Sequence, residues 1–169
     1  KTWTVMDQTA EAGSSKITLQ YSVDWQVGEH IAIASTSFNG REAEERVITA
    51  IDRSNPDKPV LTLDKPLEYR HFAATETYGD TAIDMRAEVG LLSRNIVYRG
   101  DPESSPEAQY GAIIFLHSFG DDSLVAKIAN TEFKNTGQAF KQGRYTVHFH
   151  MIGAVHKSYA KGNSVHEAF

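Results

Sequence analysis

The sequence predicts an all-β protein with repeated strand units in its second half. Three observations support this fold class: short runs with alternating apolar positions, turn-forming residues between them, and similar segments that recur at intervals of 35 and 33 residues. A repeating unit built of strands is typical of a solenoid, here a parallel β-helix, in which each coil buries one face on its neighbours. A two-layer β-sandwich is the alternative.

Four short strands are expected in the first part of the chain. They read "KITLQ", "HIAIAS", "RVITAI" and "VLTL" (Lys16–Gln20, His30–Ser35, Arg46–Ile51 and Val60–Leu63). Turn-forming residues separate them, and the Asn39–Gly40 pair suits a tight turn before the third strand. The charged run "REAEER" is long enough for only one helical turn. Residues 1–75 are therefore predicted to form a meander of short strands, followed by the repeated units in residues 76–169.

The repeats are visible in two series of segments. One series pairs "YGAIIFLHSFG" with "YTVHFHMIG" (Tyr110–Gly120 and Tyr145–Gly153). The other aligns three segments that begin at Asn95, Asn130 and Asn163. Each unit combines short strands with polar loops, and none contains a convincing helix.

The segment Tyr145–Gly153 places two histidines one residue apart in an apolar run. Side chains alternate along a strand, so three apolar residues are expected to face the core: Val147, Phe149 and Met151. His148 and His150 then share the outer face. The repeat alignment puts Ile113 and Phe115 at their positions in the preceding coil, so the histidine pair is not expected in every coil.

Composition excludes several classes of protein. The 169 residues carry a net charge of −5, which argues against nucleic acid as a partner. The absence of cysteine excludes disulfides and thiolate metal sites. No apolar stretch is long enough for direct membrane insertion by this segment. The first residues lack a signal-peptide pattern and the last stop inside a patterned segment, so we expect a truncated fragment of a larger protein.

Three segments resemble one known family: "VDWQVGEHIAIASTSF", "AIDMRAEVGLLSRNIVYRG" and "GQAFKQGRYTVHFHMIG" (Val23–Phe38, Ala82–Gly100 and Gly137–Gly153). The stretch "MRAEVGLLSRNI" is the most specific part of the match. The chain resembles the fibrocystin and fibrocystin-like family, which has an eight-glycine domain followed by parallel β-helix repeats. This family includes secreted and membrane-anchored proteins linked to hyaluronan breakdown.

The resemblance implies a division of the chain. Residues 1–75 would be the C-terminal part of a β-rich eight-glycine domain, and residues 76–169 the first coils of a right-handed parallel β-helix of the pectin-lyase-like type. It also implies an extracellular or cell-surface location, in the ectodomain of a larger protein. The expected partners are the rest of the parent polypeptide and glycans or other surface proteins.

Arg144 precedes the two histidines and lies in the same resembling segment. A guanidinium binds a carboxylate through two parallel hydrogen bonds, so Arg144, His148 and His150 could bind the carboxylate of a uronic-acid sugar. Asp121 is a further candidate ligand-binding residue. In the alternative interpretation, the histidines brace neighbouring coils and Arg144 pairs with an acidic residue, for which the candidates are Asp121, Asp122 and Glu132.

Two histidines at this spacing can also bind a divalent metal ion, but a zinc site needs at least a third protein ligand. The candidates for a third ligand are His117, His156, His166, Asp121 and Asp122. The two aspartates could instead bind calcium, although adjacent aspartates in a Gly–Ser turn are more often only solvated. The sequence does not identify the metal, and no other cofactor is expected.

Two further charged groups are assigned structural roles. Asp84, Arg86 and Glu88 alternate along one expected strand, so they are predicted to form an ion ladder with Arg86 between its two neighbours. His166 lies near a repeat anchor and is interpreted as a core or capping residue.

Two functions are compatible with these residues. We favour a structural or adhesive module of a surface coat, because a solenoid builds a long surface from local contacts. The alternative is a module that binds or depolymerises a hyaluronan-like polysaccharide. In that case Arg144 holds the carboxylate and His148 or His150 acts as acid or base. Fold class alone does not decide whether the chain is an enzyme.

Overall fold

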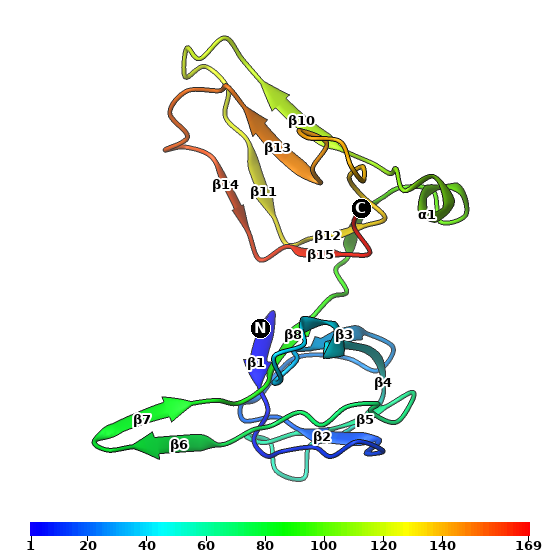
Figure 1. Ribbon diagram of the computed structural model, residues 1–169, viewed down its shortest axis with the longest axis vertical. Coiled ribbons are helices and arrows are strands. Elements are labelled where there is room, and N and C mark those ends of the chain that lie inside the picture. The colour runs from blue at the N-terminus through cyan, green and yellow to red at the C-terminus, as the bar shows by residue number, and fades with distance from the viewer. The chain divides into compact units, whose positions relative to one another are not determined.

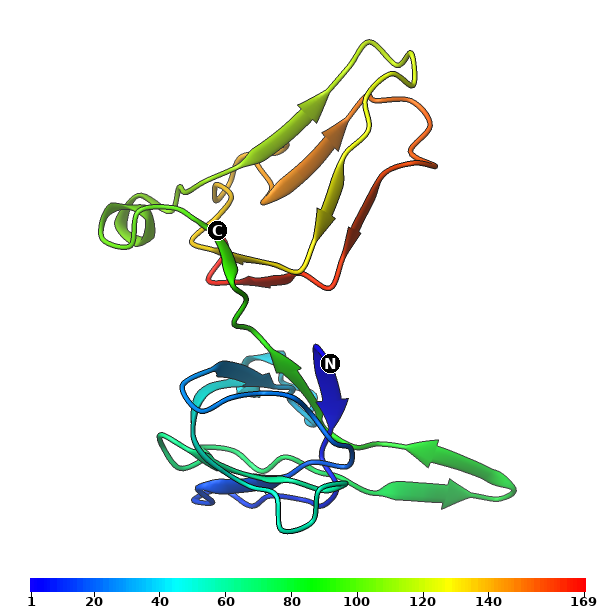
Figure 2. The ribbon, with the colours of Figure 1, turned by 180° about the vertical axis from the view of Figure 1, so that it is seen from behind.

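The computed structural model describes residues 1–169 and divides them into two compact units, Lys1–Leu92 and Ser93–Phe169. Both units are built mainly of strands, so the all-β prediction is confirmed (Figures 1 and 2). The helices are the short α1 (Ser104–Ala108) and the 3₁₀ turn η1 (Gly40–Glu42). Neither is long and apolar enough to cross a membrane.

The first unit contains a six-stranded antiparallel sheet with the order β1-β8-β3-β4-β5-β2. Its strands are β1 (Trp3–Val5), β2 (Lys16–Thr18), β3 (His30–Ile33), β4 (Glu44–Asp52), β5 (Val60–Leu63) and β8 (Glu88–Leu91). The two edge strands are joined beyond their ends by an antiparallel bridge between Met6 and Leu19. The sheet therefore closes on itself around the core, and the four strands expected in this region are all present.

The first unit extends further along the chain than residues 1–75. Strand β8 lies between β1 and β3, with Trp3 opposite Gly90 and Ile31 opposite Leu91. These pairings hold the chain up to Leu92 in the first unit. Between β5 and β8 in the chain, β6 (Thr75–Tyr78) and β7 (Thr81–Asp84) form a separate antiparallel hairpin that extends away from the sheet (Figure 1).

Alternating apolar side chains of the closed sheet form the core of the first unit. Ile31 and Ile33 of β3 and Ile48 of β4 are fully buried. Trp25 is also buried, and its indole nitrogen donates a hydrogen bond of 2.6 Å to the carbonyl oxygen of Lys1. This bond satisfies the one polar atom of the side chain, so the ring can lie in an apolar interior.

The second unit contains only parallel strand pairs. Its strands are β9 (Ile96–Arg99), β10 (Ile114–His117), β11 (Lys127–Ala129), β12 (Thr131–Lys134), β13 (Val147–His150), β14 (Tyr159–Lys161) and β15 (Ser164–His166). Strands β10, β11 and β12 pair with β13, β14 and β15 in the same order, and β12 also pairs with β9. One turn of the chain therefore lies along the next, although most strand pairs of the whole chain are antiparallel.

The register between β10 and β13 differs from the sequence alignment by two residues. Phe115 lies opposite His148 and His117 lies opposite His150, so the expected match of Ile113 with His148 is wrong. The alignment was guided by two tyrosines that do not pair. Tyr110 forms an isolated bridge with Gln138, whereas Tyr145 precedes β13. Side chains on one face of a strand recur every two residues. The shift of two residues therefore leaves the two histidines on the same face of β13 but changes the residues of β10 that lie opposite them.

Candidate functional site

Four side chains share the outer face of β10 and β13, and we call them the imidazole face: Phe115, His117, His148 and His150. The expected outward orientation of the two histidines agrees with their contacts to Phe115, which is 52% exposed. Met151, in contrast, does not face the core as predicted. It is 70% exposed, because β13 ends at His150 and Met151 adopts a left-handed backbone with φ of 49°.

The rings of the imidazole face are in direct contact. The ring centres of His148 and His150 are 5.0 Å apart, and those of His117 and His150 are 5.3 Å apart. Phe115 packs edge-on against His148 with a separation of 5.1 Å. Tyr145 extends the group, at 5.2 Å from His148. The result is an aromatic surface on the outside of the strand pair.

Backbone carbonyls orient two of the histidines. His148 Nδ1 is 2.7 Å from the carbonyl oxygen of Gly143, and His117 Nδ1 is 3.2 Å from that of His150. A carbonyl oxygen only accepts, so Nδ1–H is the donor in both hydrogen bonds. Gly143 has φ of 82°, and a Cβ there would lie 3.4 Å from His148 Cε1. A glycine therefore allows the loop to approach the ring.

A pocket of about 390 Å³ opens beside these rings and is lined by Phe115, Gln142, Gly143, Arg144, His148 and His150. The exposed side chain of Arg144 makes no hydrogen bond or ion pair. The acidic residues considered as its partners bond to other groups, so the structure contains no ion pair between Arg144 and Asp121, Asp122 or Glu132. The structure thus brings together three of the four candidate ligand-binding residues.

The fourth candidate, Asp121, lies in the turn after β10 and does not line the pocket. Its carboxylate accepts hydrogen bonds from the Ser123 hydroxyl at 2.7 Å and the Ser123 backbone at 3.1 Å, and these bonds lower the pKa of Asp121. Asp122 accepts a bond of 2.5 Å from the backbone nitrogen of Ala154. The two aspartates therefore stabilise turns rather than face the histidines.

Comparison with known proteins identifies the family of the chain. The segment 109–169 matches the CEMIP beta-helix family. Fibrocystin-L of Mus musculus is 34% identical over 204 residues, which cover 99% of this chain and 5% of that protein. The human cell surface hyaluronidase CEMIP2 is 31% identical over 159 residues, covering 86% of this chain and 11% of that protein.

The chain belongs to the fibrocystin-like family. A G8 domain-containing protein of Dictyostelium discoideum is also 31% identical over 99% of the chain and 10% of its own length. The chain thus spans about a twentieth to a tenth of the length of these relatives. The matched segment 109–169 contains β10 and β13, and therefore the whole imidazole face.

The other histidines of this fibrocystin-like chain do not join the imidazole face. His156 is exposed in the turn before β14. His166 is mostly buried, and its Nε2 lies 3.0 Å from the Glu132 carboxylate, in agreement with a core or capping role. His117 is thus the candidate third ligand that contacts the predicted pair.

The ion ladder is present only in part. Arg86 donates a hydrogen bond of 3.3 Å to the Asp84 carboxylate. No bond joins Arg86 to Glu88, because β8 begins at Glu88 while Arg86 lies in the preceding connection. The ladder is therefore a single ion pair at the base of the β6–β7 hairpin.

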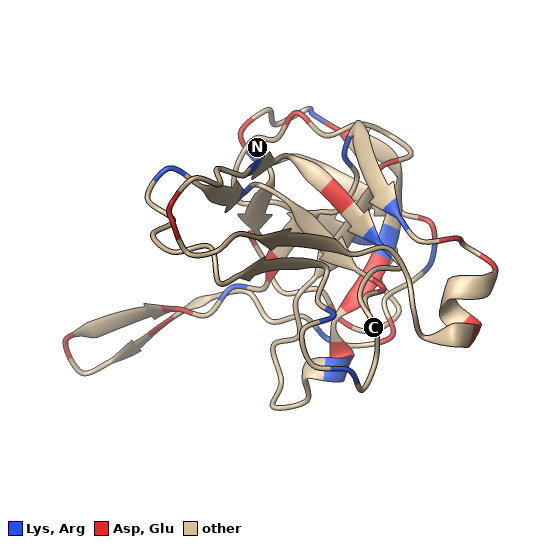
Figure 3. Ribbon diagram, turned by 90° about the horizontal axis from the view of Figure 1, so that it is seen from above, with Lys and Arg blue, Asp and Glu red and all other residues tan.

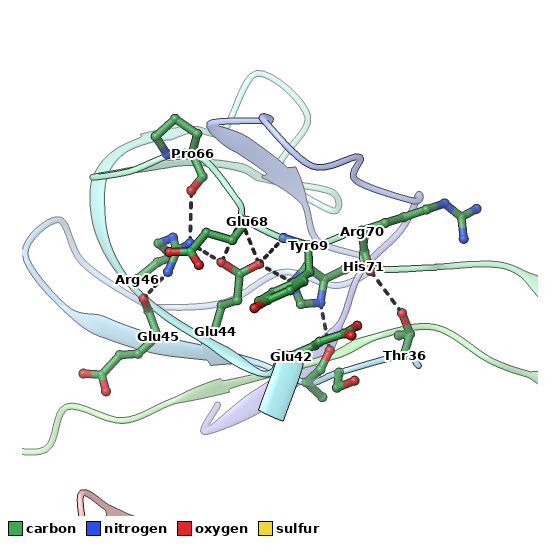
Figure 4. Close-up of polar contacts among 12 residues, drawn as sticks. Thr36, Glu42, Glu44, Glu45, Arg46, Pro66, Glu68, Tyr69, Arg70 and His71 are labelled. Atoms are coloured by element: carbon green, nitrogen blue, oxygen red, sulfur yellow. Dashed lines mark hydrogen bonds and ion pairs between the residues drawn. The ribbon is translucent and has the colours of Figure 1, made fainter. Parts of the chain in front are cut away.

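A buried polar cluster in the first unit was not predicted (Figure 4). The Glu44 carboxylate forms an ion pair with Arg46 and lies 2.9 Å from His71 Nε2. It also accepts bonds of 2.9 Å from the backbone nitrogens of Glu68 and Tyr69. The other ring nitrogen of His71 is 2.9 Å from the carbonyl oxygen of Ala34. These contacts attach the segment after β5 to strands β3 and β4.

The cluster explains the ionisation of Glu44. Burial alone would raise the pKa of its carboxyl, but the bonds from Glu68, His71 and Tyr69 and the charge of Arg46 outweigh burial and lower the pKa. The sequence did contain a signal for the cluster. Glu44 and Arg46 continue the alternation that begins at buried Ile48, yet the charged run resembles a solvated turn. Charged residues elsewhere are interspersed along the ribbon (Figure 3).

Proposed function

We propose that this chain is an extracellular, cell-surface module of a large fibrocystin-like protein, with a structural or adhesive role. In this proposal the second unit forms the first coils of a right-handed parallel β-helix. The observation that carries it is the order of the parallel pairs, in which β10, β11 and β12 are followed by β13, β14 and β15 at the same positions.

Contacts between successive coils support the proposed rod. Asn163 accepts a hydrogen bond of 3.0 Å from the Thr131 backbone and donates one of 3.2 Å to the carbonyl oxygen of Ile128. Inside the coil, Phe133 and Ile152 are buried. Such contacts link only neighbouring coils, which is how a solenoid extends into a long surface.

The location can be tested on intact cells. An antibody raised against residues 1–169 should stain living cells that express the parent protein, before any permeabilisation. An antibody against a cytoplasmic protein serves as the control for intact membranes. Staining that appears only after permeabilisation would contradict a cell-surface module.

A second candidate function is the binding of a glycan that carries uronic-acid carboxylates. Arg144 supports it, because its guanidinium is exposed and unpaired beside a pocket with an aromatic wall. The guanidinium would grip the carboxylate, and the exposed ring of Phe115 would pack on a sugar face. If cleavage also occurs, His148 or His150 would supply the acid or base near neutral pH. Asp121 would contribute only to a ligand long enough to reach its turn.

Arg144→Ala tests this candidate. Binding of uronic-acid oligosaccharides, measured by calorimetry, should weaken at least about tenfold, the loss expected when a charge-assisted pair worth about 1.5–3 kcal/mol is removed. Lys157→Ala, which removes an exposed positive charge outside the pocket, is the matched control. Size-exclusion chromatography of the polymer then reports cleavage, which His148→Ala should abolish. An equal loss of binding affinity in Arg144→Ala and Lys157→Ala would mean that binding depends only on the net charge of the chain.

A further inference from the structure

The buried polar cluster of the first unit joins Glu44 and Arg46 of β4 to His71, which follows β5 (Figure 4). We propose that this cluster is a pH-sensitive latch: His71 is a buried imidazolium ion that donates to two acceptors, and it loses one of them when it releases a proton. The part of the chain that it holds is residues 66–73, which we call the latch segment. This inference concerns the first unit and does not depend on the proposed glycan function.

Both ring nitrogens of His71 lie beside oxygen atoms. Nδ1 is 2.9 Å from the carbonyl oxygen of Ala34, and Nε2 is 2.9 Å from the Glu44 carboxylate. A carbonyl and a carboxylate only accept hydrogen bonds, whereas a neutral imidazole has a single N–H to donate. Both bonds therefore form only when each ring nitrogen carries a proton, provided that Glu44 is ionised.

Glu44 is ionised in this cluster. Its carboxylate forms an ion pair with Arg46 and accepts bonds of 2.9 Å from the backbone nitrogens of Glu68 and Tyr69. Burial alone would raise the pKa of this carboxyl, but the bonds that it accepts and the charge of Arg46 outweigh burial and lower the pKa. The proton shared with His71 therefore lies on the ring, and the ring is the cation of the pair.

The stability of the fold depends on this proton because the ring is sealed from water. The side chain of His71 is fully buried, so no solvent molecule can replace a lost partner. A neutral ring would turn a nitrogen lone pair toward the Ala34 carbonyl or the Glu44 carboxylate, and a buried acceptor without a donor is unfavourable. In the unfolded chain the imidazole releases its proton near neutral pH. The folded state thus holds an additional proton, and its stability decreases as the pH rises through this range.

Several bonds attach the latch segment to the rest of the first unit. Arg46 donates one of 3.0 Å to the carbonyl oxygen of Pro66, and the backbone of His71 exchanges bonds of 2.9 and 3.0 Å with that of Ala10. The His71 ring adds the links to β4 and to the chain after β3. Loss of the proton removes one of these two links, so the latch segment and the adjoining β6–β7 hairpin are the parts expected to loosen.

Other charged groups near the latch do not bond to the His71 ring. Arg70 pairs with Glu11 at 3.1 Å. The remaining charged side chains on the neighbouring elements are at least partly exposed: Glu42, Glu45, Asp64, Lys65, Glu68, Arg86 and Glu88. The first unit contains one other histidine, His30 of β3, which is partly exposed and lies 2.9 Å from Glu45. A pH titration of the first unit therefore has to separate His71 from His30.

Urea unfolding of the whole chain between about pH 6 and pH 8 tests the latch. Both tryptophans, Trp3 and Trp25, lie in the first unit, so tryptophan fluorescence reports its unfolding. For the parent protein, the equilibrium constant for unfolding should rise with pH, by at most about tenfold per pH unit, because one proton is released. His71→Gln cannot carry this proton, so it should be less stable at pH 6 and lose most of the rise. His30→Gln is the matched control and should keep the rise.

A second measurement applies if His71→Gln unfolds. Nuclear magnetic resonance of the nitrogen-labelled parent protein reports whether each ring nitrogen of His71 carries a proton, and we expect two protonated nitrogens at pH 7. One bare nitrogen at pH 7 would overturn the proposal, as would an equal pH dependence of unfolding in the parent protein and in His71→Gln. Loss of this dependence in His30→Gln would also contradict the latch, because it would assign the effect to the surface pair.

Discussion

The two units of the chain use their polar side chains in opposite ways. In the first unit a closed antiparallel sheet surrounds an apolar core, and even its carboxylate Glu44 is buried and fully bonded. In the second unit parallel strands stack with few fully buried side chains, and the side chain of Arg144 makes no hydrogen bond or ion pair. The difference indicates that charged side chains such as Glu44 stabilise the first unit, whereas the second unit leaves an outer face available for ligands.

The largest expected effect is the loss of the first unit's central aromatic residue. Trp25→Ala should reduce the free energy of unfolding by about 3–5 kcal/mol, because it removes a large side chain from a packed core. Trp3→Ala, at a residue that is 55% exposed, should change it by less than about 0.5 kcal/mol. Urea unfolding followed by circular dichroism measures both. Equal destabilisation by the two variants would contradict a core centred on Trp25.

The second unit should instead be sensitive to the spacing between its backbone segments. A Cβ at Gly111 would lie 1.7 Å from the carbonyl oxygen of Asn135, whereas one at Gly90 of the first unit would meet nothing within 4 Å. Gly111→Ala should therefore destabilise the second unit by about 1–3 kcal/mol, the usual cost of overpacking. Gly90→Ala should have little effect. Hydrogen exchange of the backbone amides measures this effect. If Gly111→Ala leaves the exchange rates of the second unit unchanged, Gly111 does not lie as close to Asn135 as the structure shows.

The buried carboxylate gives the first unit a specific dependence on pH. The folded pKa of Glu44 lies below its ordinary value of about 4.3, so its ionisation stabilises the fold above that pH. This contribution is lost as the pH falls through the lowered folded pKa. Glu44→Gln cannot ionise, so it should be less stable by about 1–3 kcal/mol at pH 7 and approach the parent protein in acid.

Urea midpoints between pH 7 and pH 3 measure this convergence. Glu68→Gln is the control, because its side chain is exposed and it should follow the parent protein at every pH. A constant difference between Glu44→Gln and the parent across this range would show that Glu44 acts through packing and not through its charge.

The smallest effect is expected at the acidic turn of the second unit. Asp121→Asn should change stability by less than about 0.5 kcal/mol, since the residue is exposed and bonds only to Ser123. It should also leave the affinity for short oligosaccharides unchanged, because it does not line the pocket. A clear loss of binding, measured by calorimetry, would place Asp121 in the site.

The sequence predicted those features of the two units that depend on the alternation of apolar and polar residues along a strand. Period-2 patterns identified the strands of the first unit and the outward histidines, because one face of each strand is buried. The register between β10 and β13 was not predictable, since a shift of two residues preserves the pattern. His117 was therefore considered only as one of several third ligands and was not placed opposite His150.

Long-range pairing explains the other points at which the structure differs from the sequence-based expectations. Nothing local marks β8 as a partner of β1, so the first part was expected to end before it. Glu44 and His71 are far apart in the sequence, and a buried ion pair between them depends on how the sheet closes. The free side chain of Arg144 likewise depends on where Asp121, Asp122 and Glu132 find their own partners.

We propose that the imidazole face and Arg144 form the ligand-binding surface of the chain. The most direct test is a nuclear magnetic resonance titration of the isotope-labelled chain with a uronic-acid oligosaccharide. We predict shifts at Arg144, His148, His150 and Phe115 while the resonances of the first unit stay in place. Shifts that arise mainly in residues 1–92, or no shifts at millimolar oligosaccharide, would contradict it.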